Sequence, residues 1–183
     1  VHDVLGGGLR PDKTLWMAHA FRCKGDPRAA DMMERCLAIS GSTYHWPDRM
    51  HPLTMGGTGQ RPHDVSASVA FLVLLRQCLV DEDSANELTL LGGIPARSWQ
   101  SEGFYKCTQV ATLYGTLGFK LEYSQGKIAI TLSPNFHSYP DRIRIYLPGP
   151  IIETSVGTRV GNQLIISPDT TFVEVTLDLP VHA

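Results

Sequence analysis

The chain has 183 residues, with 16 basic and 18 acidic side chains and a formal net charge of −2 at pH 7. Its hydrophobic content of 43% with only 19% charged residues is typical of a folded chain and excludes extensive disorder. No basic block stands out, so we expect no nucleic-acid partner. No membrane association is expected either, because the most apolar run, residues 69–75, is followed at once by Arg76 and Gln77.

Two helices are predicted close to the N-terminus. Apolar side chains recur at helical spacing over residues 12–24, and Gly25 ends this first helix. Asp26 is placed to act as the N-cap of a second helix over residues 27–40, which begins with a proline. The two helices therefore form a helical hairpin with a very short corner.

A polar loop and a third helix follow. Residues 44–62 are rich in His, Gly and Pro, and loops of this length are usually functional or mobile. The third helix begins at Pro62 or Asp64 and runs to about Leu79. Because it is apolar on nearly all sides after Val65, we expect it to be buried.

The hydrophobic period changes from helical to alternating after the charged segment 81–86. We place the domain boundary there, with an α-helical region over 1–85 and a β-region over 86–183. Two hairpin turns are predicted, at 124–126 and at 161–162. The fold class is therefore α+β, with helices followed by an antiparallel β-sandwich. The predicted strands are 87–91, 106–111, 116–123, 127–132, 142–146, 163–166 and 172–177.

The aromatic and acidic residues of the loop are the first candidate site residues. Tyr44 and Trp46 are suited to form an aromatic platform for a sugar ring, although Trp46 fits equally well as part of the helical core. Asp48 and Asp64 are candidates for a general acid, a general base or a ligand of substrate hydroxyl groups. Asp64 also fits the N-cap of the third helix.

The loop histidines complete the predicted site. His51 and His63 are expected to bind substrate by hydrogen bonds, and with no third ligand in view we expect no metal and no cofactor. The glycine-rich residues 56–59 lack the ending of a phosphate-binding loop, so a tight turn is the better interpretation. We expect Trp46, Asp48, His51 and His63 to share one concave surface at the start of the third helix.

The four cysteines are Cys23, Cys36, Cys78 and Cys107, and none forms a CxxC pair. Buried free thiols are expected, with a Cys23–Cys36 bridge as the open alternative. Unpaired cysteines and the absence of a visible signal peptide favour a cytoplasmic location.

Three sequence segments together carry a family resemblance: WPDRMHP at 46–52, PHDVSASVAFLVLLRQCLV at 62–80 and ELTLLGGIPARSW at 87–99. Their order resembles the C-terminal part of six-hairpin (α/α toroid) glycoside hydrolases. In that group the last barrel helices pass into a Leu-rich strand, a Gly-Ile-Pro turn and a small β-sandwich.

The resemblance implies a carbohydrate-active protein that is incomplete for catalysis, because a toroid needs about a dozen helices and its acid and base lie partly in upstream hairpins. The alternative is a non-catalytic carbohydrate-binding or assembly module. A saccharide is the expected ligand in both cases. We further expect the apolar third helix to pack against another chain, either in a homodimer or against the remainder of a larger enzyme.

Overall fold

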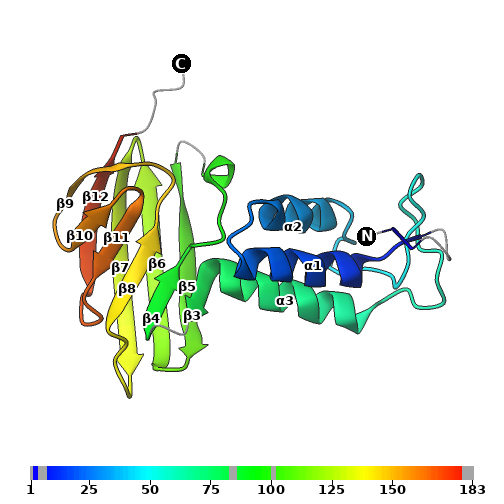
Figure 1. Cartoon of the computed structure of the whole chain (residues 1–183), viewed down its shortest axis with the longest axis horizontal. Coiled ribbons are helices and arrows are strands. Elements are labelled where there is room, and N and C mark those ends of the chain that lie inside the picture. The colour runs from blue at the N-terminus through cyan, green and yellow to red at the C-terminus, as the bar shows by residue number, and fades with distance from the viewer. Residues whose placement is uncertain (1, 4–7, 83–85, 100–101, 179–183) are drawn as a thin grey trace. The chain divides into compact units, whose positions relative to one another are not determined.

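The computed structural model describes residues 2–3, 8–82, 86–99 and 102–178. The chain divides into two compact units, Val1–Gln77 and Cys78–Ala183. Within the described residues, the α-helices lie almost wholly in the first unit and two five-stranded sheets lie in the second (Figure 1). The predicted α+β class is therefore confirmed. The predicted boundary at 85/86 adjoins residues 83–85, which lie outside the described part, and it stays a prediction.

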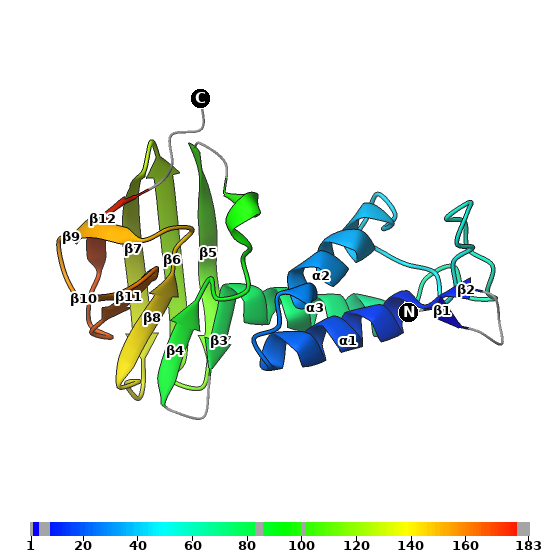
Figure 2. The ribbon, with the colours of Figure 1, turned by 45° about the horizontal axis from the view of Figure 1, so that its top comes forward.

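The first unit contains three α-helices in its described part, drawn in Figures 1 and 2. They are α1 (Pro11–Cys23), α2 (Arg28–Ala38) and α3 (Val65–Leu79), and α3 reaches into the second unit with its last two residues. Two short antiparallel strands, β1 (His2–Asp3) and β2 (Gly8–Leu9), precede them. Among the helices described, none combines the length and apolarity that a membrane span requires.

The corner between α1 and α2 follows from Gly25 and Asp26. Gly25 has φ +67°, its N–H donates to the Arg22 carbonyl, and the Asp26 N–H donates to the Phe21 carbonyl at 2.9 Å. This is the Schellman arrangement that glycine favours at a helix end. The Asp26 carboxylate then accepts the Arg28 backbone N–H at 3.0 Å, so Asp26 lies at the start of α2 as predicted, although Pro27 occupies the N-cap position. Hydrogen bonds from the Arg28 side chain and backbone lower the pKa of Asp26 to about 2.

Helix α3 is buried on one side only, and its exposed side is the apolar face that we expect to pack against another chain. Val65, Val69 and Leu72 are 74%, 46% and 61% exposed, and their spacing of four and three residues places them on one face. We call these three residues the α3 stripe. The opposite side packs into the helical unit through buried residues, namely Ala67, Ala70, Phe71 and Leu74.

The second unit contains two sheets of five strands each in its described part. In order across the sheet, the first contains β10 (Thr158–Val160), β11 (Gln163–Ile166), β8 (Arg142–Tyr146), β4 (Glu87–Leu90) and β3 (Val80–Glu82). The other contains β5 (Glu102–Thr112), β6 (Gly115–Ser124), β7 (Lys127–Phe136), β12 (Phe172–Leu177) and β9 (Ile151–Thr154). A short 3₁₀ helix, Ala96–Ser98, lies between β4 and β5. The seven predicted strands are confirmed, and β3, β9 and β10 were not predicted.

Strand pairing is antiparallel throughout the two described sheets except between β4 and β8, which run parallel. The prediction of a wholly antiparallel arrangement is therefore wrong at this pair. Parallel neighbours need a long connection that returns the chain to the same end of the sheet. Here β5, β6 and β7 of the other sheet lie between β4 and β8 in sequence and supply that connection.

The predicted hairpin turns are confirmed. The β6–β7 turn consists of Gln125 and Gly126, with φ +50° and +78°, as a type I′ turn requires. The β10–β11 turn has φ +62° at Gly161, next to Asn162. Both turns fix the register of the strands they join.

One hydrophobic core contains side chains from both sheets. Leu88 and Ile143 enter it from the β4–β8 pair, while Leu121, Ile130 and Val175 enter it from the other sheet. In each strand, the residues immediately before and after a core residue point to the opposite face of the sheet. The alternating sequence pattern therefore separates a core face from an outer face in both sheets.

Candidate functional site

The predicted site loop is a hairpin rather than an irregular segment. At its base the Asp64 N–H donates to the Trp46 carbonyl at 2.7 Å, and farther out the Asp48 N–H donates to the Arg61 carbonyl at 3.1 Å. Met50 forms isolated bridges to Gly57 and to β2. These backbone bonds give the loop a defined base and a defined far turn.

Trp46 lies in the core of the helical unit. Its side chain is 0% exposed, its indole N–H donates to the Cys36 carbonyl at 2.7 Å, and its ring centroid lies 5.2 Å from that of Phe71. A fully buried indole has no open face for a sugar ring. Of the two roles that the sequence left open, the core role is the one observed, and the proposed platform role of Trp46 is wrong.

Asp64 caps α3. Its Oδ1 accepts the Ser66 backbone N–H at 3.1 Å and its carbonyl accepts the Ser68 N–H at 3.2 Å, while the residue is only 9% exposed. These are the bonds expected of an N-cap aspartate. The carboxylate is therefore engaged by its own helix.

Asp48 lies on the inner side of the loop against Gly59. Its Oδ1 is buried and has no hydrogen-bond partner among the residues that the structure describes. A Cβ atom built on Gly59 would lie only 1.7 Å from this oxygen, so position 59 needs glycine as long as the carboxylate stays there. A buried carboxylate oxygen without a partner calls for a water molecule or another ligand.

His51 lies at the far turn of the loop. Its Nδ1 accepts the backbone N–H groups of Leu53 and Thr54, at 3.2 and 3.3 Å. The imidazole therefore stabilises its own turn. Because Trp46 is fully buried, the predicted surface shared by Trp46, Asp48, His51 and His63 is wrong for Trp46, and the grouping of the other three residues stays a prediction.

Tyr44, His45 and His63 form the exposed part of the loop base. His63 is exposed, and its ring centroid lies 4.3 Å from that of half-buried His45, whose Nδ1 is 2.8 Å from the Thr43 hydroxyl. Tyr44 precedes His45 with φ +53° and is 66% exposed. Sequence reasoning missed His45, although it stands between the two aromatic residues that it selected.

Tyr44 is the most unusual residue of this group. A left-handed backbone is rare for a bulky residue and is strained by about 1–2 kcal/mol. Such strain persists only where the surroundings impose it, and it clusters at ligand-binding positions. Tyr44 keeps this backbone conformation while its side chain is 66% exposed, so the phenol lies in solvent.

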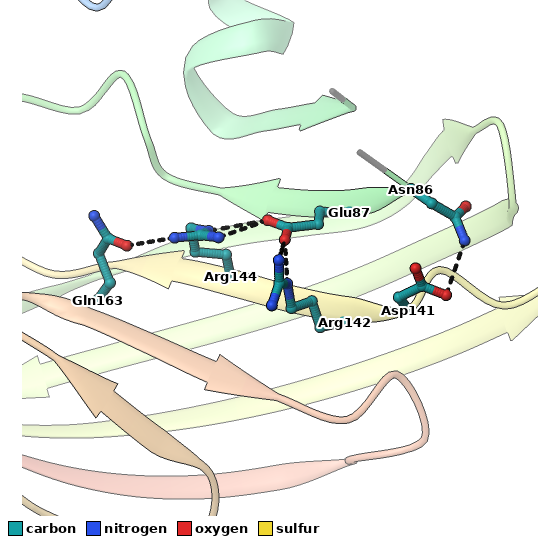
Figure 3. A network of polar contacts seen from close by, with 6 residues as sticks. All are labelled: Asn86, Glu87, Asp141, Arg142, Arg144 and Gln163. Atoms are coloured by element: carbon teal, nitrogen blue, oxygen red, sulfur yellow. Dashed lines mark hydrogen bonds and ion pairs between the residues drawn. The ribbon is translucent and has the colours of Figure 1, made fainter. Parts of the chain in front are cut away.

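A second polar cluster lies on the outer face of the β4–β8 pair (Figure 3). Both carboxylate oxygens of buried Glu87 accept guanidinium N–H groups, one from Arg142 and the other from Arg144 at 2.7 and 3.1 Å. Arg144 also donates to the Gln163 side chain at 2.7 Å. Because both oxygens are engaged, Glu87 acts as a clamp between the parallel strands rather than as an acid or base.

The cysteines, all within the described residues, are free, so the alternative Cys23–Cys36 bridge is not formed. Cys23 is exposed, and burial raises the pKa of the Cys36 thiol to about 11. Among the described residues, no group of three or more His, Cys, Asp or Glu side chains is arranged to hold a metal ion.

Comparison of the chain with protein-family models, with curated proteins and with solved structures gives no match. The resemblance to six-hairpin glycoside hydrolases therefore stays a prediction.

Proposed function

We propose that this chain is a glycoside-hydrolase-like, saccharide-binding module that does not hydrolyse its ligand by itself. In this proposal α1, α2 and α3 correspond to the last hairpins of an α/α toroid, and the two sheets correspond to the β-sandwich that follows it. The order of a helical unit and then a two-sheet unit with one core supports this correspondence.

The observation that carries the proposal is the loop base formed by Tyr44, His45 and His63. An exposed phenol held by a strained backbone offers a flat apolar surface, and two adjacent imidazole rings offer hydrogen-bonding nitrogens. This combination suits a sugar ring, which has apolar C–H faces and a rim of hydroxyl groups. Tyr44 and His63 were predicted to bind substrate, and they remain the proposed ligand contacts.

The carboxylates of the loop favour binding without hydrolysis. Glycoside hydrolysis uses two carboxyl groups that flank the scissile bond. Asp64 is occupied as a helix cap, which leaves Asp48 as the only one of the two candidate acids that is not capping a helix. Asp48 would then need a partner from another chain or from a larger enzyme.

Replacement of Tyr44 by glycine tests the proposal. Tyr44→Gly removes the phenol and suits the left-handed backbone, so the free energy of unfolding should stay within about 1 kcal/mol of the original value. Affinity for neutral oligosaccharides, measured by isothermal titration calorimetry, should fall about tenfold or more. Leu53→Ser is the matched control, because Leu53 is 87% exposed at the far turn and should not affect affinity.

Two results would contradict the proposal. Unchanged affinity in Tyr44→Gly would remove the loop base as the site. Release of reducing sugar by the purified chain would show that it is a complete hydrolase.

A further inference from the structure

A hollow of about 900 Å³ lies on the sheet formed by β5, β6, β7, β12 and β9, and all residues that line it belong to the second unit. Its volume falls within the range of about 300–1,000 Å³ that is typical of small-ligand clefts. The hollow opens on the outer face, because Leu121, Ile130 and Val173, which are the chain neighbours of Glu122, Ala129 and Glu174, point into the core.

Three cross-strand neighbours form the middle of the hollow. Ala129 on β7 pairs with Glu122 on β6 and with Glu174 on β12. Directly paired residues point to the same face, and strands lie about 4.8 Å apart, so the two glutamate Cα atoms are about 10 Å apart. The small Ala129 side chain therefore forms a floor between two exposed carboxylates.

An aromatic side chain extends this row. Phe104 on β5 is the cross-strand partner of Glu122, lines the hollow and is 65% exposed. The hollow thus combines the apolar ring of Phe104, the small side chain of Ala129 and two carboxylates that accept hydrogen bonds. This combination, and not the acidic residues alone, resembles a binding surface for a ring-shaped polar ligand.

The charge of the lining selects among such ligands. Glu102, Glu122 and Glu174 carry three negative charges and Lys127 carries one positive charge, so the lining sums to −2. Lys120 also forms an ion pair with Glu122 at 2.7 Å, with both side chains exposed. An exposed pair of this kind contributes little, so a ligand ammonium group can replace Lys120.

We propose that this hollow binds a saccharide that carries protonated amino groups, as an oligomer of glucosamine does. The ammonium groups would be held by Glu122 and Glu174, and a sugar face would lie against Phe104. The inference rests on the proposed function in one respect, that the ligand is a saccharide.

Calorimetric titration with a glucosamine tetramer at low ionic strength tests the inference. The double variant Glu122→Gln and Glu174→Gln keeps the size of both exposed side chains and should lose about tenfold or more in affinity. Glu153→Gln is the matched control, because Glu153 is exposed on β9 of the same sheet but lies outside the hollow. The fully N-acetylated tetramer, which lacks the ammonium groups, should bind the original chain about tenfold more weakly.

Each contrary outcome has a separate meaning. Unchanged affinity in the double variant, equal affinity for the acetylated tetramer, or equally tight binding of spermidine would each overturn the inference. Loss of tetramer binding in Tyr44→Gly would place the ligand at the loop base, which overturns the inference but agrees with the proposed function. If the chain binds neutral oligosaccharides and not the glucosamine tetramer, the inference fails alone. If it binds neither, both fail.

Discussion

Replacement of Trp46 provides the sharpest test of the helical unit. The indole is fully buried, contacts Phe71 and donates to the Cys36 carbonyl, so Trp46→Ala removes an aromatic contact and a hydrogen bond and leaves a large cavity. Substitutions of this type reduce the free energy of unfolding by about 3–5 kcal/mol. That is a large fraction of the roughly 5–15 kcal/mol that stabilises a typical domain.

Trp46→Phe separates packing from hydrogen bonding. It keeps a ring in the core but removes the indole N–H. The Cys36 carbonyl still accepts the Ile39 N–H at 3.3 Å, so it is not left without a partner. The loss should then be close to the ordinary value of about 1 kcal/mol for a hydrogen bond, with a further small loss of packing.

Urea denaturation followed by far-UV circular dichroism measures both effects, because the helices dominate that signal. Trp16→Phe is the control, since Trp16 is 40% exposed and its replacement should change stability by no more than about 0.5 kcal/mol. If Trp46→Ala lies within about 1 kcal/mol of the original chain, the indole is not a core residue. The sugar-platform role would then have to be reconsidered.

Three further predictions concern the cap, the thiols and assembly. Asp64→Ala should reduce the free energy of unfolding by about 0.5–2 kcal/mol. Asp64→Asn can still cap α3, so it should reduce the free energy of unfolding much less. Equal reductions in the two variants would argue against capping. Cys23 should react rapidly with a thiol reagent at neutral pH, whereas Cys36, with its raised pKa and its burial, should react only on unfolding; equal rates would contradict the burial. The exposed α3 stripe should mediate a homodimer detectable by sedimentation velocity, and Leu72→Glu should convert it to a monomer. A monomer at high micromolar concentration in the original chain would refute dimerisation.

Local signals predicted the parts of the fold that depend on a few adjacent residues. Gly25 and Asp26 together specified the end of α1 and the start of α2, because glycine accepts a left-handed backbone and aspartate accepts helix N–H groups. Gln125 and Gly126 likewise specified a tight turn, since the strands on either side alternate in polarity up to that point.

The roles of the loop residues depended on contacts that sequence does not reveal. Trp46 and Tyr44 lie two positions apart in the same polar loop, yet one is fully buried and the other is 66% exposed. The difference arises from the Cys36 carbonyl and the Phe71 ring, which belong to two other segments of the chain. Only the Asp64 cap could be predicted, because its partners are its immediate neighbours in sequence.

The composition of the hollow also could not be predicted from the sequence, because it depends on the order of the strands across the sheet. Alternation along β7 indicates that Ala129 points outward, but it does not indicate which strands lie beside it. Consecutive strands are adjacent in most sheets, which would place β8 next to β7. Such an order would bring Arg142 or Arg144 beside Ala129 in place of Glu174 and change the charge of the lining from −2 to 0. The observed neighbour is instead β12, the last strand, and it supplies Glu174. The negative charge of the hollow, and with it the proposed class of ligand, is therefore a property of strand order.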